Sequence, residues 1–413
     1  MEKHILVIAQ YFYPEQFRIN DICSEWVKRG YKVTVITGIP NYPLGKYYKG
    51  YGLFKKRKET YNGIEVIRIP LIPRGRNSIM LALNYLSFVI SGLFWKMFTK
   101  IKADYVFIFE VSPMTQALPG VWYAKKRKIP CYLYVQDLWP ENVEIITGIT
   151  NRKIIGAIGK MVDYIYSYCT KIFTTSNSFV TSIESRGVSI EKIEYWPQYA
   201  EDFYKPLNKI KENKINEDKI IIDEIPNDDV FNIIFAGNIG TAQGLAILPK
   251  TASLIKEKNP NKKIRFNIVG DGRYKEELVK IVDENKLTDM FNFIPKQPAT
   301  RIPEFMAASD AAFLCLTGGP LFSKTIPAKL QSYMACGIPI LASASGETDK
   351  IIKESGSGLC SPAGDYEMLA DVIIQLSNES PQRLLELGVN ARSYYENNFN
   401  KQELLNRIDK YFE

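Results

Sequence analysis

The feature that most constrains the fold of this chain is a regular alternation of short apolar runs with longer helical patterns. The apolar runs are continuous, as strands buried on both faces of a parallel sheet are. Predicted strands are 5–9, 32–37, 64–69, 104–109, 131–136 and 171–175, followed by 232–236, 264–270, 291–294, 311–316 and 339–343. Strand–helix alternation in two blocks predicts an α/β protein with two doubly wound, Rossmann-like sheets.

Length and charge also indicate two domains. A chain of 413 residues is too long for one hydrophobic core. We place the first domain at residues 1–203 and the second at 204–393, with the charged, Asn-rich stretch 205–229 as a linker and surface insertion. Residues 1–200 carry a net charge of +12, whereas 201–413 carry −4. The basic residues form no Arg-rich stripe with interleaved aromatics, so we expect an anionic membrane or lipid phosphate as partner and no nucleic acid.

The numbers and positions of the histidines and cysteines exclude several kinds of catalytic and metal site. The single histidine, His4, excludes a Ser-His-Asp triad and a His-based zinc site, and we predict neither a metal nor a cofactor. The six cysteines lie far apart without a CxxC pair, which predicts buried free thiols in a reducing compartment. The N-terminus enters a strand pattern directly, so no signal peptide is predicted.

The stretch FAGNIGTAQGL, residues 235–245, reads as a strand, a glycine loop and a helix start. Such a loop, with Gly237 and Gly240, cradles a phosphate on backbone amides. The loop contains no Lys or Arg, so a bound diphosphate needs its counter-charge from elsewhere. The second helix start, SKTIPAKLQSYMACGIPI at 323–340, offers Lys324 and Lys329 for that purpose. The alternative is that both lysines are merely solvated near a helix start.

Further candidates follow other strands, because ligands of open α/β sheets bind beyond the carboxyl ends of the strands. In the second half these are Gly270, Asp271 and Arg273, which we expect to contact a phosphate-bearing donor substrate. In the first half the candidates for contacting an acceptor are Arg18, Asn20, Asn41 and Tyr42.

The segment 78–98 is apolar on every face and has basic flanks. Arg74 and Arg76 precede it, and Lys96, Lys100 and Lys102 lie at its end. At about 1.5 Å per residue it would cover much of a bilayer core. A transmembrane span and a buried core helix are two interpretations. We favour a third, in which the helix is partly buried and its exposed side dips into the membrane interface.

Six stretches, in order over nearly the whole chain, resemble the family 4 glycosyltransferases. They are VTVITGIPNYP, QDLWPE, TTSNSF, FAGNIGTAQGL, IVGDG and KLQSYMACGIPI. The resemblance is greatest to bacterial O-antigen and capsule transferases that use UDP-activated N-acetylated amino sugars, the N-acetyl-L-fucosamine transferase type included. It implies a two-domain GT-B fold whose C-terminal helix, about 394–413, crosses back to the first domain. It also implies a nucleotide-sugar donor on the second domain and metal-free transfer with retained anomeric configuration.

The sequence departs from this family at the donor site. Much of the family carries Arg and Lys where this chain has Asn238 and Gln243. The family's paired glutamates, which hold sugar hydroxyls and the ribose, correspond to Lys324 and Ser332, and we expect Glu347 as a replacement ribose ligand. A His-Asp pair of the family is Gln136-Asp137 here.

The resemblance also implies a mechanism in which the leaving phosphate oxygen deprotonates the acceptor hydroxyl. Cations and helix N-termini around the diphosphate, Lys329 among them, then stabilise the developing charge. Asp137 and Glu141 are the candidates for orienting the acceptor or stabilising positive charge at the anomeric carbon, with Trp139 beside the acceptor. Alternatively, DLWPE is only a helix start, with Asp137 as its cap and Trp139 in the core.

Together these observations predict a membrane-associated retaining glycosyltransferase at the cytoplasmic face of the inner membrane. It would move an N-acetylated amino sugar from UDP to an undecaprenyl-diphosphate-linked saccharide in O-antigen or capsule assembly. Two alternatives stay open: a UDP-sugar epimerase or hydrolase on the same fold, and a catalytically silent membrane-surface protein that binds nucleotide sugars. The sequence leaves the oligomeric state, the linkage and the acceptor saccharide undefined.

Overall fold

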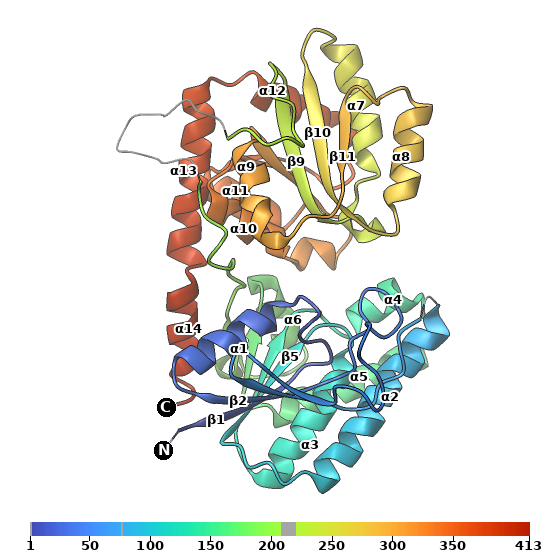
Figure 1. Cartoon of the computed structure of the whole chain (residues 1–413), viewed down its shortest axis with the longest axis vertical. Coiled ribbons are helices and arrows are strands. Elements are labelled where there is room, and N and C mark those ends of the chain that lie inside the picture. The colour runs from blue at the N-terminus through green and yellow to red at the C-terminus, as the bar shows by residue number, and fades with distance from the viewer. Residues whose placement is uncertain (1, 76, 208–219) are drawn as a thin grey trace. The chain divides into compact units, whose positions relative to one another are not determined.

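The computed structural model describes residues 2–75, 77–207 and 220–413, which form two compact units (Figure 1). Unit 1 extends to Trp196 and includes Leu405–Glu413, and unit 2 runs from Pro197 to Leu404. The junction therefore lies a few residues before the boundary at 203 that the sequence indicates. Arg76 and residues 208–219, which include much of the predicted linker, lie outside the described residues.

Unit 1 is built on an eight-stranded sheet in the order β3-β4-β2-β1-β5-β6-β7-β8. Every pairing is parallel except that of β3 with β4. The central strands are fully buried because both faces of the sheet are covered by helices, as their continuous apolar sequences predict. The strands are β1 (His4–Ile8), β2 (Lys32–Thr37), β3 (Lys58–Tyr61), β4 (Ile64–Arg68), β5 (Tyr105–Glu110), β6 (Cys131–Val135), β7 (Lys171–Thr174) and β8 (Ile193–Tyr195).

Three helices of unit 1 start at short polar side chains that accept hydrogen bonds from the first-turn amides, whereas α1, α3 and α4 have no side-chain cap. Asn77, Asn151 and Ser176 cap α2, α5 and α6 in this way. The helices are α1 (Arg18–Lys28), α2 (Ser78–Phe98), α3 (Leu118–Arg127), α4 (Glu141–Thr147), α5 (Arg152–Tyr168) and α6 (Asn177–Glu184), with 3₁₀ turns at Met114–Ala117 and Ile190–Lys192.

Unit 2 is built on a six-stranded, fully parallel sheet in the order β11-β10-β9-β12-β13-β14. The chain leaves β9 toward β10 on one side and leaves β12 toward β13 on the other, so the strand order reverses between β9 and β12. The strands are β9 (Phe231–Asn238), β10 (Ile264–Asp271), β11 (Phe291–Ile294), β12 (Ala311–Cys315), β13 (Ile340–Ser343) and β14 (Gly358–Ser361).

Helices cover both faces of the unit 2 sheet and enclose one apolar core on each. α7, α8 and α12 contribute to the first core, and α9, α10, α11 and α13 to the second. These helices are α7 (Ile247–Lys258), α8 (Lys275–Glu284), α9 (Ile302–Ala307), α10 (Ala328–Cys336), α11 (Glu347–Ser355), α12 (Tyr366–Ser377) and α13 (Pro381–Asn398), with 3₁₀ turns at Thr241–Gln243, Ala299–Arg301 and Phe322–Lys324.

The last helix, α14 (Lys401–Asp409), carries the chain back to unit 1. Arg407 donates to the carboxylate of Glu194 at 3.1 Å and to the carbonyl of Tyr195 at 2.6 Å. The Phe412 ring lies 5.4 Å from Trp26, edge to face, in the core of unit 1. Both the predicted pair of doubly wound sheets and the return of the C-terminal helix to the first domain are therefore confirmed.

Candidate functional site

The glycine loop of unit 2 follows β9 and is closed by its own side chains. The Gln243 Oε1 atom accepts a hydrogen bond from the Gly240 amide at 3.1 Å and one from Asn238 Nδ2 at 3.4 Å. Gly237 and Asn238 are exposed at the end of the strand. The two residues that stand where the resembled family has Arg and Lys therefore bond each other and hold the loop, leaving its rim uncharged.

The loop after β10 lies directly beside the glycine loop. Gly270 pairs with Gly237 and Asp271 with Asn238 across the two strands. A Cβ atom at Gly270 would lie 1.9 Å from the Gly237 carbonyl oxygen, so this close approach requires glycine. Asp271 accepts from the Gly272 amide at 2.8 Å, and both Asp271 and Arg273 are exposed. The structure thus brings these predicted donor residues to one edge of the sheet.

Lys329 is the cation that reaches the glycine loop. Its side chain crosses Gly237, where a Cβ atom would lie 2.5 Å from Lys329 Cε and 3.1 Å from Nζ. The ammonium lies 4.0 Å from the centre of the Phe235 ring. None of the described residues pairs with it as a carboxylate or accepts a hydrogen bond from it. Partial burial among protein atoms disfavours the charged form and lowers the pKa of Lys329 to about 7, and the Cys315 thiol acts in the opposite direction.

Helix α10 adds backbone donors beside Lys329. The helix starts after Pro327, and no side chain caps its first turn. Its free amides carry the positive end of the helix dipole, which favours an anion. The structure therefore places a lysine without a counter-ion, a glycine loop and an uncapped helix start at the carboxyl ends of β9 and β12, which suits a diphosphate.

The remaining predicted donor residues occupy two environments. Lys324 lies in the turn that packs on Gly346, where a Cβ atom would be 2.0 Å from the Ser323 carbonyl oxygen. Glu347, the first residue of α11, follows that glycine and is buried. Ser332 is buried in α10 and donates to the Ala328 carbonyl at 3.2 Å, so its hydroxyl is turned to its own helix.

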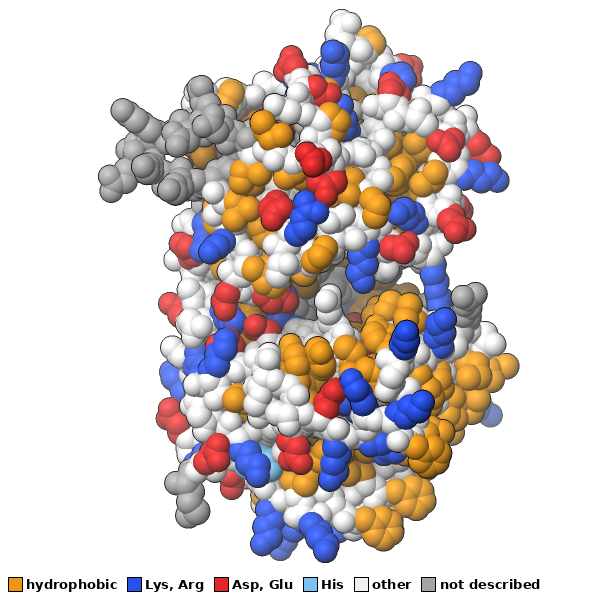
Figure 2. Space-filling model, viewed as in Figure 1, with side chains coloured by type: hydrophobic (Ala, Val, Ile, Leu, Met, Phe, Trp, Pro, Cys, Tyr) orange, Lys and Arg blue, Asp and Glu red, His pale blue; other side chains and the backbone are white. Residues whose placement is uncertain are grey.

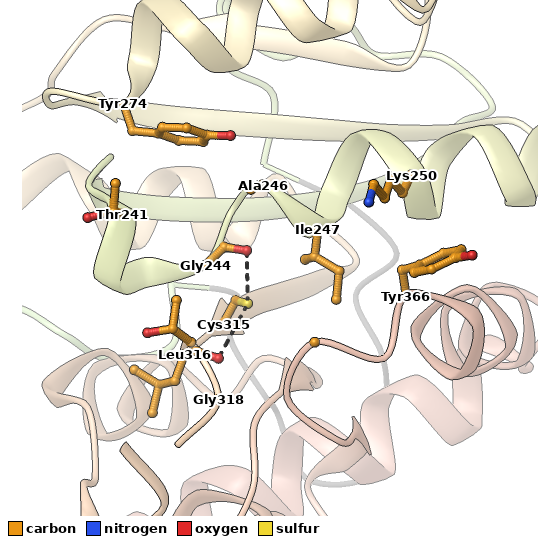
Figure 3. Close-up of a pocket in the computed structure, with 12 residues that line it drawn as sticks. Thr241, Gly244, Ala246, Ile247, Lys250, Tyr274, Cys315, Leu316, Gly318 and Tyr366 are labelled. Atoms are coloured by element: carbon orange, nitrogen blue, oxygen red, sulfur yellow. Dashed lines mark hydrogen bonds between the residues drawn. The ribbon is translucent and has the colours of Figure 1, made fainter. Parts of the chain in front are cut away.

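A pocket of about 340 Å³ opens where the strand order of the unit 2 sheet reverses (Figure 3). The loops after β9 and β12 diverge at this point, which is where open α/β sheets bind their ligands. Tyr274 lies at one end of the pocket, and Lys250 and Tyr366 lie at the other. The lining residues are Thr241, Gly244, Ala246, Ile247, Lys250, Tyr274, Cys315, Leu316, Thr317, Gly318, Gly364 and Tyr366.

The sequence analysis named the glycine loop but not the side chains that complete this pocket. Lys250 lies one turn into α7, and Tyr274 and Tyr366 lie in the connections after β10 and β14. Their only sequence signal is a position just beyond a predicted strand or helix start. The Cys315 thiol lies between the glycine loop and Leu316, and burial raises its pKa to about 12, so the thiol stays protonated.

In unit 1, Asp137 follows β6 and is tied to the loop after β5. Its Oδ2 atom accepts from the Ser112 amide at 2.7 Å. The Ser112 hydroxyl accepts from Trp139 Nε1 at 3.1 Å and from Asn142 Nδ2 at 2.9 Å. Trp139 is buried, so its predicted contact with an acceptor is not supported and the core interpretation holds. Asp137 does not cap α4, which starts after Pro140 without a side-chain cap and carries the exposed Glu141 in its first turn.

Glu110, which the sequence analysis missed, completes an acidic pair with Asp137. This last residue of β5 is fully buried, and its Oε1 atom has no hydrogen-bond partner among the described residues. The Asp137 amide lies 3.4 Å from its Oε2 atom. Burial raises the pKa of Glu110 well above its usual range, and the charge of Asp137 adds to this effect. The signal in the sequence is a lone acid that ends an apolar strand.

The other predicted acceptor residues lie at the carboxyl ends of β1 and β2. Asn41 is buried and structural, since its amide donates to Glu15 Oε1 at 2.7 Å and its Oδ1 accepts from the Arg74 amide at 3.0 Å. Asn20 donates to the Glu15 carbonyl at 2.7 Å. Arg18 starts α1, and the Tyr42 ring lies 5.0 Å from the Arg74 guanidinium. The predicted acceptor role of Asn41 is therefore not supported.

Metal and histidine chemistry find no support in the part of the chain that the structure describes. It holds no group of three or more His, Cys, Asp or Glu side chains that could bind a metal ion. His4 is buried in the sheet, and its two ring nitrogens lie 2.7 Å from the Lys102 carbonyl and 2.8 Å from the Thr34 hydroxyl. Its role is structural.

Comparisons with known proteins match this geometry. Residues 216–394 match the family model "Glycosyl transferases group 1". A colanic acid biosynthesis glycosyl transferase of Escherichia coli K12, WcaI, is 24% identical over 98% of both chains. Sucrose-phosphate synthase of Thermosynechococcus elongatus superposes with a TM-score of 0.73 at 15% identity, covering 100% of this chain and 98% of its own. Anabaena HepE, in complex with UDP and glucose, gives 0.69 at 15% identity over 99% of both chains. The chain is therefore a protein of GT-B fold whose residues 216–394 are similar to the group 1 glycosyl transferases.

Proposed function

We propose that this protein is a retaining glycosyltransferase that moves an N-acetylated amino sugar from a UDP donor to a lipid-diphosphate-linked saccharide during assembly of a surface polysaccharide. The observation that carries the donor half of this proposal is Lys329, an unpaired ammonium lying against Gly237 at an uncapped helix start. HepE, a structural neighbour, binds UDP and glucose, and WcaI is named for colanic acid biosynthesis. Both support the proposal by analogy.

In this proposal the diphosphate lies on the glycine loop with Lys329 as its counter-charge. The adjoining pocket, with Tyr274 and Tyr366, receives the rest of the donor, because its 340 Å³ is within the range of small-ligand sites. The negative charge that develops on the leaving phosphate is stabilised by the ammonium and the free amides of α10. No protein base is needed if the leaving oxygen itself takes the proton of the acceptor hydroxyl.

The acceptor half of the proposal rests on unit 1. The half-buried Asp137 and the exposed Glu141 place carboxyl groups just beyond β6, where a saccharide hydroxyl would find hydrogen-bond partners, and the fully buried Glu110 lies beside Asp137 without reaching the surface. We propose that the enzyme acts at the cytoplasmic face of the inner membrane, where an undecaprenyl-diphosphate acceptor would be carried. The expected use of neither metal nor cofactor belongs to the same proposal.

A donor panel tests the proposed function. Purified protein is incubated with UDP-N-acetylhexosamines, other UDP-sugars or GDP-sugars and a lipid-diphosphate acceptor, and products are read by mass. We expect transfer from a UDP-N-acetylamino sugar, lost in Lys329→Ala and largely retained in Lys324→Ala. Turnover of the donor without acceptor would point to an epimerase or hydrolase. A melting temperature that rises with millimolar UDP, with no product from any donor, would leave a catalytically silent protein that binds nucleotide sugars, because a ligand of the native state must stabilise it.

A further inference from the structure

Helix α2 presents an unpartnered apolar stripe on the outside of unit 1. By length and composition it could cross a membrane, with a mean hydropathy of 1.6 and only 17% of its most apolar window buried. The exposed residues recur every three or four positions, so they share one face. They are Ile79, Leu83, Leu86, Ile90, Leu93 and Met97, with Phe94 and Phe98 beside them. Figure 2 shows hydrophobic side chains gathered along this side of unit 1.

The opposite face of α2 is anchored in unit 1. Asn84 is fully buried, and its Oδ1 atom accepts from Gln10 Nε2 at 2.8 Å. Gly92 lies against Pro119 of α3, where a Cβ atom would be 2.3 Å from the proline ring. The Trp95 ring stacks on Tyr123 at 5.4 Å. A membrane crossing would pull these groups out of the core, so the helix is held as a surface element with one face free.

Basic residues flank the stripe at its C-terminal end. Lys100 and Lys102 follow α2 and are exposed. α3, which packs along α2, ends in four consecutive exposed basic residues at 125–128, and the Lys126 ammonium lies 3.5 Å from the Met97 carbonyl. Figure 2 shows Lys and Arg side chains on the same side of unit 1.

A second basic and apolar group lies in the loop 44–57, which starts near the N-terminal end of α2. The Gly75 amide donates to the Gly45 carbonyl at 3.1 Å, and Gly75 in turn abuts Met80 of α2. The tip of this loop carries Phe54, which is 97% exposed and is followed by Lys55 and Lys56. Leu53, before it, is also exposed, and both side chains would gain free energy by leaving water for an apolar phase.

Charge decides which partner covers this surface. No aspartate or glutamate occurs between Glu65 and Asp104, or between Glu110 and Asp137. In a symmetric contact of this surface with itself, a second copy of the chain would bring like charges to both ends of the stripe. An anionic lipid surface offers phosphates at the level of the lysines and acyl chains at the level of the stripe.

We propose that α2, the tip of loop 44–57 and the basic end of α3 form one surface that binds an anionic bilayer, with the axis of α2 in the plane of the interface. This membrane surface would bring the enzyme to its lipid-linked acceptor, so its biological role rests on the proposed function. Binding of vesicles by this surface is measured without any sugar.

Vesicle sedimentation tests the surface. The full chain is mixed with sucrose-loaded vesicles of phosphatidylcholine, with or without phosphatidylglycerol. Leu86→Gln/Ile90→Gln/Phe94→Gln removes exposed apolar bulk and keeps the anchored face, and we expect at least about a tenfold lower partition coefficient on both vesicle types. Met368→Gln/Leu385→Gln/Val389→Gln, at comparably exposed positions of unit 2, is the matched control and is expected to bind as the wild type does.

Charge is tested separately. We expect Lys125→Gln/Lys126→Gln/Lys128→Gln to bind phosphatidylglycerol vesicles about 100-fold more weakly and phosphatidylcholine vesicles unchanged. Lys256→Gln/Lys258→Gln/Lys280→Gln, which removes the same charge from unit 2, is expected to bind as the wild type does. Wild-type binding that neither surface variant weakens would overturn the proposal, and so would a wild-type dimer that Leu86→Gln/Ile90→Gln/Phe94→Gln dissociates. If vesicles bind as expected but no donor is ever transferred, the proposed function fails and the membrane surface stands.

Discussion

Lys329 makes UDP binding depend on pH in a direction that can be worked out from the structure. The amine has a pKa of about 7 in the free protein because it is desolvated and lacks a carboxylate. A diphosphate beside it would favour the charged form and raise that pKa again. At pH 8 only roughly one amine in ten is charged before binding, so each UDP is expected to draw in about 0.9 proton, against about 0.5 at pH 7. Affinity is expected to fall about tenfold per pH unit above 7 and to be flat below it, until the nucleotide itself titrates.

Calorimetry measures this proton directly. UDP is titrated into the protein at pH 8 in buffers of different ionisation enthalpy, where the terminal phosphate, with a pKa of about 6, is already ionised. Lys329→Met keeps the apolar stem and removes the titrating group, so proton uptake is expected to vanish and affinity to drop by at least about 100-fold. Lys324→Met is the matched control and is expected to retain the uptake. Binding of UDP by the wild type at pH 8 without proton uptake, or equal uptake in Lys329→Met, would refute the reasoning.

The same group predicts a gain in stability when the lysine is lost. The folded pKa lies below the usual 10.5, so the unfolded chain holds the proton more tightly and the free energy of unfolding rises with pH between about 7 and 10.5. The advantage of Lys329→Met over the wild type, about 5 kcal/mol at most, is therefore expected to be greatest below pH 7 and to shrink above it. Thermal melts of the nucleotide-free proteins across this range check the trend.

Three further perturbations test other parts of the site. Gly237→Ala would place a Cβ atom 2.5 Å from Lys329 Cε, so we expect UDP affinity to fall at least about tenfold. The control is Gly319→Ala, at a similar φ of +136° but with no atom within 4 Å of the added Cβ. Equal losses of UDP affinity in the two variants would mean that backbone strain, not contact with Lys329, is responsible. Glu110→Gln replaces an acid whose pKa is raised by burial, so the native state binds the proton more tightly than the unfolded chain and wild-type stability falls as pH rises above about 4.3. The variant is expected to match the melting temperature of the wild type near pH 4 and to melt higher at pH 8. A difference in melting temperature that stays constant with pH would argue against a neutral Glu110. Lys250→Ala and Tyr366→Ala are expected to weaken UDP-sugar binding about tenfold in equilibrium dialysis, whereas Lys258→Ala, farther along α7, leaves it unchanged.

The fold could be predicted because its central strands are buried on both faces and leave continuous apolar runs in the sequence. The strands that escaped prediction lie at or near sheet edges, where that signal disappears. β3 reads KETY and alternates between exposed and half-buried positions, and β14 is the short run GLCS. The C-terminal helix expected at about 394–413 is the end of α13 followed by α14, because the chain breaks at Phe399 and Asn400.

The site could be predicted only where strand order alone brings residues together. β9 and β12 are neighbours, so the glycine loop and the start of α10 had to meet, and Lys329 reaches Gly237. The burial of Asn41 could not be read from its motif, and that of Trp139 was only one of two alternatives; hydrogen bonds hold both inside unit 1. Glu110 was missed because a strand-ending acid reads as a solvated chain end, whereas here β6 and the loop after it cover it.

The absence of arginine and lysine from the glycine loop has a physical consequence beyond the relocation of one charge. An arginine on the loop would stay charged at every accessible pH. Lys329 fills the space that a side chain at Gly237 would need, and its ammonium lies 4.0 Å from the centre of the Phe235 ring. With a pKa of about 7, the amine is only half charged at pH 7 in the free protein, and in the proposed complex the diphosphate would favour complete protonation. A neutral sugar without a diphosphate would gain no binding energy from this amine. Lys329 would therefore select ligands by charge as well as by shape, and the same ligands would bind more weakly in alkaline solution.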